Sequence, residues 1–280
     1  MRNFDLLEPK TVQEACQLLG DGDDVRLIGG GTALLILMKQ GLVRPRRLIN
    51  LKKLEGTNAI TYDPRSGLRI EAVATIHEVE SSAVVREHFP VLAEACHQVA
   101  NIRIRHLATI GGNLAHGDHQ SDPPGVLVAL DASLELSSSN GIRTVRLADF
   151  LVGLYETGLA PGEMVTAVSV PPVRGRLVGT YVKFTTGSSE ERPCAGVTAL
   201  IRLEQDKPVE ARLAIGAVGP RPLLVGEMNP SQEGLASMAD RAALDVDPIA
   251  DLRGSEQYKR HLVGVLGRRA LVDVWAEAAQ

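Results

Sequence analysis

The first residues whose types suggest chemistry form the glycine run Gly29-Gly30-Gly31-Thr32. It follows a short apolar strand predicted over 25–28 and precedes a helix predicted over 33–39. Glycines between a strand and a helix let backbone N–H groups approach an anion. The run lacks the Gly-Lys-Ser/Thr end of a P-loop, and Leu34 occupies the last glycine position of a GxGxxG fingerprint. Taken alone, the run is therefore equally consistent with a tight turn.

A second glycine pair occurs about 80 residues later, in a segment that we predict to be a polar loop. The segment reads Thr109-Ile110-Gly111-Gly112-Asn113-Leu114-Ala115-His116, and Ser121-Asp122 follows it. Two glycine loops are able to hold one pyrophosphate from both sides. Asp122 is then placed to accept a hydrogen bond from a ribose or ring donor, and His116 to contact a phosphate.

Other kinds of chemistry have little support. The histidine and aspartate side chains between 116 and 122 are loosely spaced, so we expect solvated loop residues rather than a metal site. There is no G-x-S-x-G nucleophile elbow. The cysteines are far apart, which argues against a disulfide framework and against a cysteine-ligated iron–sulfur cluster on this chain; they are Cys16, Cys96 and Cys194.

Composition narrows the classes of protein further. The net charge is −4, whereas a duplex-binding protein usually has a basic surface, so nucleic acid is not an expected partner. No apolar run is long enough for a membrane span, and the N-terminus has no secretory pattern, so we expect a cytoplasmic protein. Gly is 27 of 280 residues while aromatic residues are 3%, which favours a ligand held by backbone rather than by ring stacking.

The elements that must position these residues fall into an α+β arrangement. Thr11 and Glu14 are spaced as in a capping box before a helix, and with the strand–glycine–helix unit they predict a βαβ-like lobe over 1–54. The lobe over 55–175 predicts antiparallel strands, with a second capping box at Thr75 and Glu78 and a hairpin at Asn140-Gly141.

A proline- and glycine-rich stretch over 171–176 predicts the domain boundary, giving domains over 1–175 and 176–280. Beyond it we expect strands over 180–184, 196–203 and 209–218. A polar stretch over 227–254 then leads to a C-terminal helix that begins at Glu256.

These motifs, in this order, resemble the FAD-binding medium subunit of molybdenum hydroxylases, the xanthine dehydrogenase and aerobic carbon-monoxide dehydrogenase family. The two glycine segments carry the resemblance, together with Ala214-Ile215-Gly216-Ala217-Val218-Gly219-Pro220 and the helix from Tyr258 through Arg268-Arg269-Ala270-Leu271. The resemblance implies an FAD-binding domain of the vanillyl-alcohol-oxidase (PCMH) type in two lobes, followed by a smaller α+β domain.

The resemblance also implies which residues bind FAD. It places the pyrophosphate on the first loop, the adenosine-side carboxylate at Asp122 and apolar adenine contacts at Met164 and Val165, with Lys183 near the flavin ring. The two loops contribute Leu27, Ile28, Gly29, Gly30, Gly31, Thr32, Ala33, Leu34, Thr109, Ile110, Gly111, Gly112 and Asn113. From the residues alone, we would instead expect Met164 and Val165 to be strand core and Lys183 to be a surface charge. The segment 188–193 lacks the ring-covering Tyr of some relatives.

By resemblance, this chain receives electrons from [2Fe-2S] clusters on a small partner subunit and passes them to NAD, a quinone or oxygen. A large partner subunit with a molybdenum–pterin cofactor oxidises the substrate, which is carbon monoxide, an aldehyde, a purine or another N-heterocycle. The expected assembly is a dimer of heterotrimers. Two alternatives stay open, a self-contained flavin oxidase of the same fold superfamily and a flavin-free assembly module.

Overall fold

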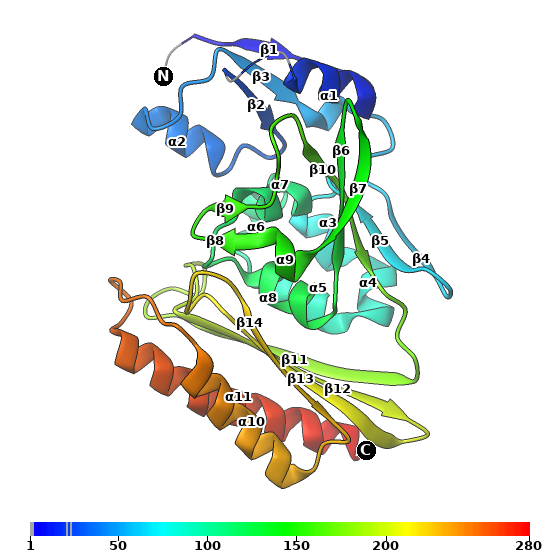
Figure 1. Ribbon diagram of the computed structural model, residues 1–280, viewed down its shortest axis with the longest axis vertical. Helices are drawn as coiled ribbons and strands as arrows, with labels where there is room; N and C mark the ends of the chain where they lie inside the picture. Colours follow the sequence, from blue (N-terminus) through cyan, green and yellow to red (C-terminus); the bar gives the residue numbers. More distant parts are fainter. Residues whose placement is uncertain (1–2, 21, 23) are drawn as a thin grey trace.

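Three β-sheet units follow one another along the long axis of the computed structural model, which describes residues 3–20, 22 and 24–280 (Figure 1). The first is a parallel sheet in the order β1-β3-β2, built from β1 (Asp5–Leu7), β2 (Val25–Ile28) and β3 (Arg47–Asn50). It is accompanied by α1 (Val12–Leu19), α2 (Leu34–Gln40) and the 3₁₀ turn η1 (Leu51–Lys53). The predicted βαβ unit is confirmed as β2–α2–β3, and β1 adds a further parallel strand.

The cap of α1 differs from the prediction. The Thr11 hydroxyl accepts from the Glu14 amide at 3.2 Å, as expected. The Glu14 carboxylate, however, accepts from the amide of Lys10 at 2.9 Å, so the reciprocal half of the capping box is not formed.

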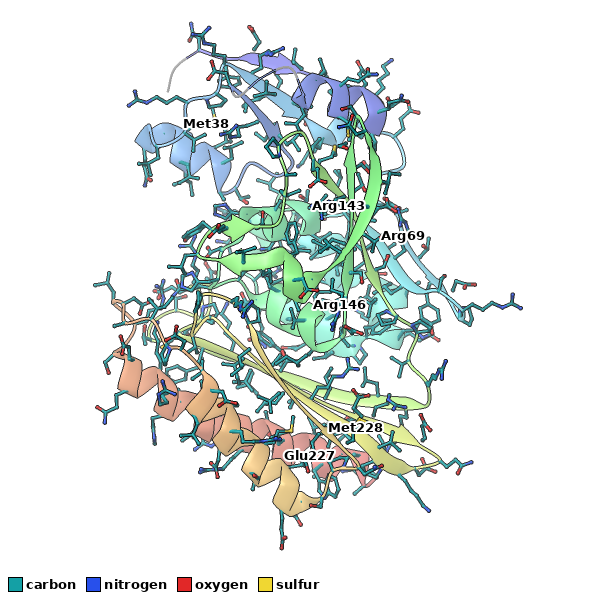
Figure 2. All side chains as sticks on the ribbon, in the orientation of Figure 1. Met38, Arg69, Arg143, Arg146, Glu227 and Met228 are labelled. Carbon is teal, nitrogen blue, oxygen red and sulfur yellow. The ribbon has the colours of Figure 1, made fainter. Side chains whose placement is uncertain are left out.

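The middle unit is a five-stranded antiparallel sheet in the order β4-β5-β10-β6-β7. Arg69 lies on β5 at the side of this sheet (Figure 2). It reaches across β10 to Glu135 on β6 with two bonds of 3.1 Å. The hairpin predicted at Asn140-Gly141 is confirmed as β6–β7. The strands are β4 (Ile60–Asp63), β5 (Gly67–Glu71), β6 (Ser133–Ser138), β7 (Gly141–Arg146) and β10 (Met164–Val170).

Short helices cover this sheet and close its apolar core. The capping box at Thr75 and Glu78 is confirmed in both directions, with bonds of 3.1 and 2.7 Å. Sheet residues such as Ile70 and Val168 share the core with Leu92 and Leu127 from the helices. The unit contains α3 (Ile76–Ser81), α4 (Ala83–His88), α5 (Pro90–His97), α6 (Ile102–Arg105), α7 (Ile110–His116), α8 (Asp122–Ala129), α9 (Leu147–Phe150), β8 (Leu151–Gly153) and β9 (Glu156–Thr157).

The C-terminal unit is an antiparallel meander whose outer face is covered by two helices (Figure 1). Val178 and Ile201 pack toward these helices, whereas Tyr181, Leu200 and Ala214 join the core of the middle unit. The sheet therefore lies between the helices and the middle unit. Its elements are β11 (Arg176–Phe184), β12 (Ala195–Glu204), β13 (Lys207–Gly216), β14 (Leu223–Met228), α10 (Gln232–Asp245) and α11 (Glu256–Ala278).

Three predictions about elements were wrong. The polar stretch expected over 227–254 contains helix α10, whose buried face is built of small or flexible residues, among them Met238 and Ala239. Strand β11 begins at Arg176 rather than at 180. The glycine pair expected in a polar loop instead forms the first turn of α7, because the Thr109 hydroxyl caps that helix by accepting from the Gly112 amide at 3.1 Å.

Across the described ranges, the helices are all too short or too polar to pass through a membrane.

Candidate functional site

The two glycine segments predicted to act together do lie against each other. A Cβ built on Gly29 would be 2.8 Å from the hydroxyl of Thr109. A Cβ built on Gly30 would be only 2.0 Å from the carbonyl oxygen of Leu107 and 2.7 Å from the Cα of Ala108. The obstacle at Gly30 is backbone, so only glycine permits this approach. The N-terminal lobe and the middle unit meet at this point.

The first glycine segment offers a run of free backbone donors. Among residues 3–20, 22 and 24–280, the amides from Gly29 to Leu34 donate to no acceptor, and the Thr32 hydroxyl has no hydrogen-bond partner. Gly31 has φ +71°, which bends the chain between β2 and α2. Successive unpaired amides at such a bend form a concave site suited to an anion such as a pyrophosphate.

The second glycine segment differs from the first. The amide of Ile110 donates to Ala74 O and that of Gly111 to Ala72 O, both at 2.9 Å, and Gly112 donates to its cap. These amides are therefore used within the chain, and the expectation that both segments offer backbone donors was wrong for this one. A Cβ on Gly111 would meet the Ala72 Cβ at 2.5 Å, so this glycine serves helix packing.

Beyond the second segment, a buried polar cluster contains Asp122 and Lys183. Asp122 Oδ1 accepts from the Tyr181 hydroxyl at 2.7 Å, and Oδ2 lies 3.3 Å from Lys183 Nζ, although Lys183 is 61 residues away in sequence. Lys183 also donates to Gln98 O at 2.6 Å. Both carboxylate oxygens are hydrogen-bonded within the chain, and the predicted alternative of a surface charge is wrong for Lys183. The resemblance implies that Asp122 lies on the adenosine side and Lys183 near the flavin ring; because the two side chains are in contact, they cannot lie at opposite ends of one FAD.

Sequence reasoning missed Tyr181 as a member of this cluster. The signal was present, because residues two apart on a strand point to the same face and Tyr181 therefore accompanies Lys183. The side chain of Tyr181 is 5% exposed, and burial raises the pKa of its hydroxyl well above the ordinary range. Burial also raises the pKa of Asp122 to about 6, an effect that Lys183 and the Tyr181 hydrogen bond oppose.

The cluster is connected to the glycine segments by Asn113. Its Oδ1 accepts from the Ser121 hydroxyl at 2.9 Å, and Ser121 immediately precedes Asp122 at the start of α8. The structure thus places Gly29, Thr109, Asn113, Ser121 and Asp122 along a continuous path, which runs from the free amides to the polar cluster.

His116 lies at the end of α7, half-buried beside Tyr155, with ring centroids 5.2 Å apart. Burial lowers the pKa of the His116 imidazole, so the ring is neutral at pH 7 and adds no positive charge for a phosphate. The nearby Asp118 forms an ion pair of 2.8 Å with Arg192. Within the described ranges, no three His, Cys, Asp or Glu side chains are grouped to hold a metal ion.

Met164 and Val165 lie in apolar cores, with side chains 2% and 5% exposed. Met164 packs with Ala15 and Ile49 of the N-terminal lobe, whereas Val165 belongs to the core of the middle unit. These adjacent residues of β10 therefore pack into the cores of both lobes, as expected for buried strand residues.

A second network, which sequence reasoning also missed, fixes the segment before Asp122 to the C-terminal unit. Gln120 Nε2 donates to Asp251 Oδ2 at 2.8 Å, and the fully buried Lys259 Nζ pairs with Asp251 Oδ1 at 2.9 Å. Lys259 also donates to Ile249 O at 2.8 Å. The partners of Lys259 lie eight and ten residues upstream in the loop before α11, and Asp251 in turn bonds to Gln120 of the middle unit, so no local pattern marks the network.

The comparisons with known proteins agree with this architecture. A family model described as the FAD binding domain in molybdopterin dehydrogenase matches residues 2–173, and a model described as the CO dehydrogenase flavoprotein C-terminal domain matches residues 188–274. The chain belongs to the family of FAD-binding medium subunits of molybdenum hydroxylases, and it is an oxidoreductase subunit.

Its relatives span its whole length. The carbon monoxide dehydrogenase medium chain of Hydrogenophaga pseudoflava is 32% identical, over 99% of this chain and 98% of that one. The glyceraldehyde dehydrogenase medium chain of Sulfolobus acidocaldarius is 28% identical, over 97% and 98%. Among solved structures, carbon monoxide dehydrogenase from H. pseudoflava superposes with a TM-score of 0.92 at 31% identity, covering 98% of each chain. Quinoline 2-oxidoreductase from Pseudomonas putida 86 gives 0.91 at 27% identity, covering 100% and 99%.

Proposed function

We propose that this chain carries FAD and transfers electrons within a multi-subunit molybdenum-dependent hydroxylase. It would take them from [2Fe-2S] clusters of a small partner subunit and deliver them to NAD, a quinone or oxygen. The observation that carries the proposal is the run of unpartnered amides from Gly29 to Leu34, held against Thr109 in a domain whose family binds FAD. We also propose domains over 1–175 and 176–280, and the cytoplasm as the location.

The residues present suit such a cofactor. The amides of the first glycine segment and the Thr32 hydroxyl would hold the pyrophosphate, and Asn113 and Ser121 would line the path toward Asp122 and Lys183. Lys183, buried beside Asp122, would lie at the flavin end of the site, where charge and hydrogen bonds tune the ring. FAD, when bound, supplies the redox chemistry, and the protein supplies its position and electrostatics.

The metal centres would belong to partners. Cys16, Cys96 and Cys194 are buried in separate cores, and burial raises the pKa of each thiol, which disfavours the thiolate that an iron–sulfur cluster needs. We therefore propose a small iron–sulfur subunit and a large molybdenum–pterin subunit as partners, assembled as a dimer of heterotrimers. The large subunit would select the substrate.

Affinity purification of the tagged chain from its native host tests this function. The proposal expects two further chains to co-purify, with iron, molybdenum and FAD in the complex, and reduction of the flavin when the substrate of the complex is added. A chain that purifies alone, with flavin bleached directly by its own substrate, would instead support the self-contained oxidase. A chain that refuses added FAD would support the assembly module.

A further inference from the structure

A second concave site lies between the middle unit and the C-terminal sheet, away from the glycine segments. It is an open pocket of about 250 Å³. Buried or half-buried apolar side chains from both units form its floor, namely Phe89, Leu130, Leu177 and Leu200. Helix α8 begins at Asp122 and reaches this pocket with Ala129, so roughly 12 Å of helix separates the two sites.

The rim of the pocket is charged, and most of its charges neutralise one another. Arg202 pairs with Glu204 and, at 3.1 Å, with Glu210. Arg212 pairs with Glu210 at 2.6 Å, and it donates to Ala129 O at 2.9 Å, which ties the sheet to α8. These two arginines are therefore fixed by the two glutamates that line the same rim.

Arg174 is the exception on this rim. Its guanidinium makes no hydrogen bond or ion pair with any residue in the described ranges, and the residue is exposed in the linker between the two units. Three arginines face two glutamates around the pocket, so one positive charge is left over at Arg174. A guanidinium fork binds a carboxylate with two parallel bonds.

We propose that this pocket binds a small monocarboxylate with an apolar body. The floor around Leu130 and Leu200 buries the body, and Arg174 binds the carboxylate head. A neutral analogue leaves the guanidinium without a partner, whereas a dianion brings a second charge toward Glu204 and Glu210. Small-molecule sites often lie at such junctions between units, with an apolar lining and a few placed polar groups. The inference does not depend on the proposed flavin site.

Calorimetric titration of the purified full chain with benzoate and hexanoate tests this site, with benzyl alcohol and hexanol as neutral counterparts. Both acids are expected to bind about tenfold more tightly than the matched alcohols. Arg174→Gln is expected to lose about tenfold in affinity for the acids and to leave the alcohols unchanged. Leu177→Trp is expected to abolish binding by filling the pocket, with Arg174 still present.

Arg269→Gln is the matched control, because Arg269 is an exposed arginine on α11, on the other side of the sheet. It should keep the wild-type affinity. If neither benzoate nor hexanoate gives a heat of binding, the proposal is overturned. Equal binding of acids and alcohols, or unchanged affinity in Arg174→Gln, overturns it as well. Circular dichroism and melting temperature like those of the wild type confirm that each variant is folded. Arg174→Gln removes the charge and Leu177→Trp fills the apolar floor, so the two variants test the site in separate ways.

Discussion

Gly30 lies directly on the backbone of Leu107, so that a Cβ at Gly30 would be 2.0 Å from the Leu107 carbonyl oxygen. This contact joins the N-terminal lobe to the turn that leads into α7. It also fixes the free amides of the first glycine segment in place, because they belong to the same bend of the chain. Packing between the lobes and the presentation of the donors are therefore one feature of the structure.

Gly30→Ala should destabilise the protein, because the new methyl group must displace backbone rather than a flexible side chain. We expect a loss of about 1–3 kcal/mol in the free energy of unfolding, measured by urea denaturation. Gly264→Ala is the matched control, since its Cβ would meet the Ala243 Cβ at an ordinary 3.5 Å. Equal stability of the two variants would show that the lobes do not meet as described.

Thr32→Ala should weaken FAD binding without loss of stability. The Thr32 hydroxyl has no partner among the described residues, so its removal breaks no internal hydrogen bond. We expect the dissociation constant for FAD to rise about tenfold, as for loss of one hydrogen bond to a charged group. Flavin fluorescence titration measures this, with the exposed Thr61→Ala as control. Wild-type affinity in Thr32→Ala would remove that hydroxyl from the site.

Asp122→Asn should change how stability depends on pH. The native pKa of Asp122 is about 6 against an ordinary value of 3.8, so the folded state holds the proton more tightly. The stabilisation from the protonated carboxyl is full below pH about 4, and it is lost as pH rises through 6. Relative to the Asn variant, the free energy of unfolding of the wild type should fall by about 3 kcal/mol over this pH range. Parallel pH profiles in urea unfolding would contradict the assignment.

Lys259→Met should destabilise the junction between the units. The substitution leaves Asp251, which is a quarter exposed, without its 2.9 Å ion pair. We expect the free energy of unfolding, measured by urea denaturation, to fall by about 2–3 kcal/mol. This is below the range for fully buried pairs, because water reaches Asp251. The control is Arg268→Gln, which removes the exposed pair with Asp240 and should change stability by less than about 1 kcal/mol. Similar losses in both variants would refute the structural role of Lys259.

Local patterns predicted much of the fold. The hairpin at Asn140-Gly141 and the capping box at Thr75 and Glu78 depend on residues close in sequence, so the sequence alone is enough to predict them. Helix α8 was not predicted, because it is buried on all sides and its apolar residues show no 3.6 period. Its Pro123 and Pro124 are typical of loops, although prolines are also tolerated in the first turn of a helix.

The site was predictable in its parts but not in its contacts. The glycine types at 29–31 and 111–112 indicated a backbone-lined site, yet nothing local shows that Gly30 rests on Leu107 or that α7 uses its own amides. The pairing of Asp122 with Lys183 depends on packing between two units, over 61 residues of sequence. Such contacts are set by tertiary structure, which neither residue spacing nor the resemblance to a family supplied.

The proposed function depends on FAD bound to this chain at the first glycine segment. Its most direct test is the amount of FAD released by acid from the complex purified through this chain, with Thr32→Ala purified in parallel. We expect FAD equimolar with the chain in the wild type, and a smaller amount in the variant after the same dialysis. A wild-type complex that contains no FAD, and takes up none when it is incubated with the cofactor, would show that this chain does not carry FAD.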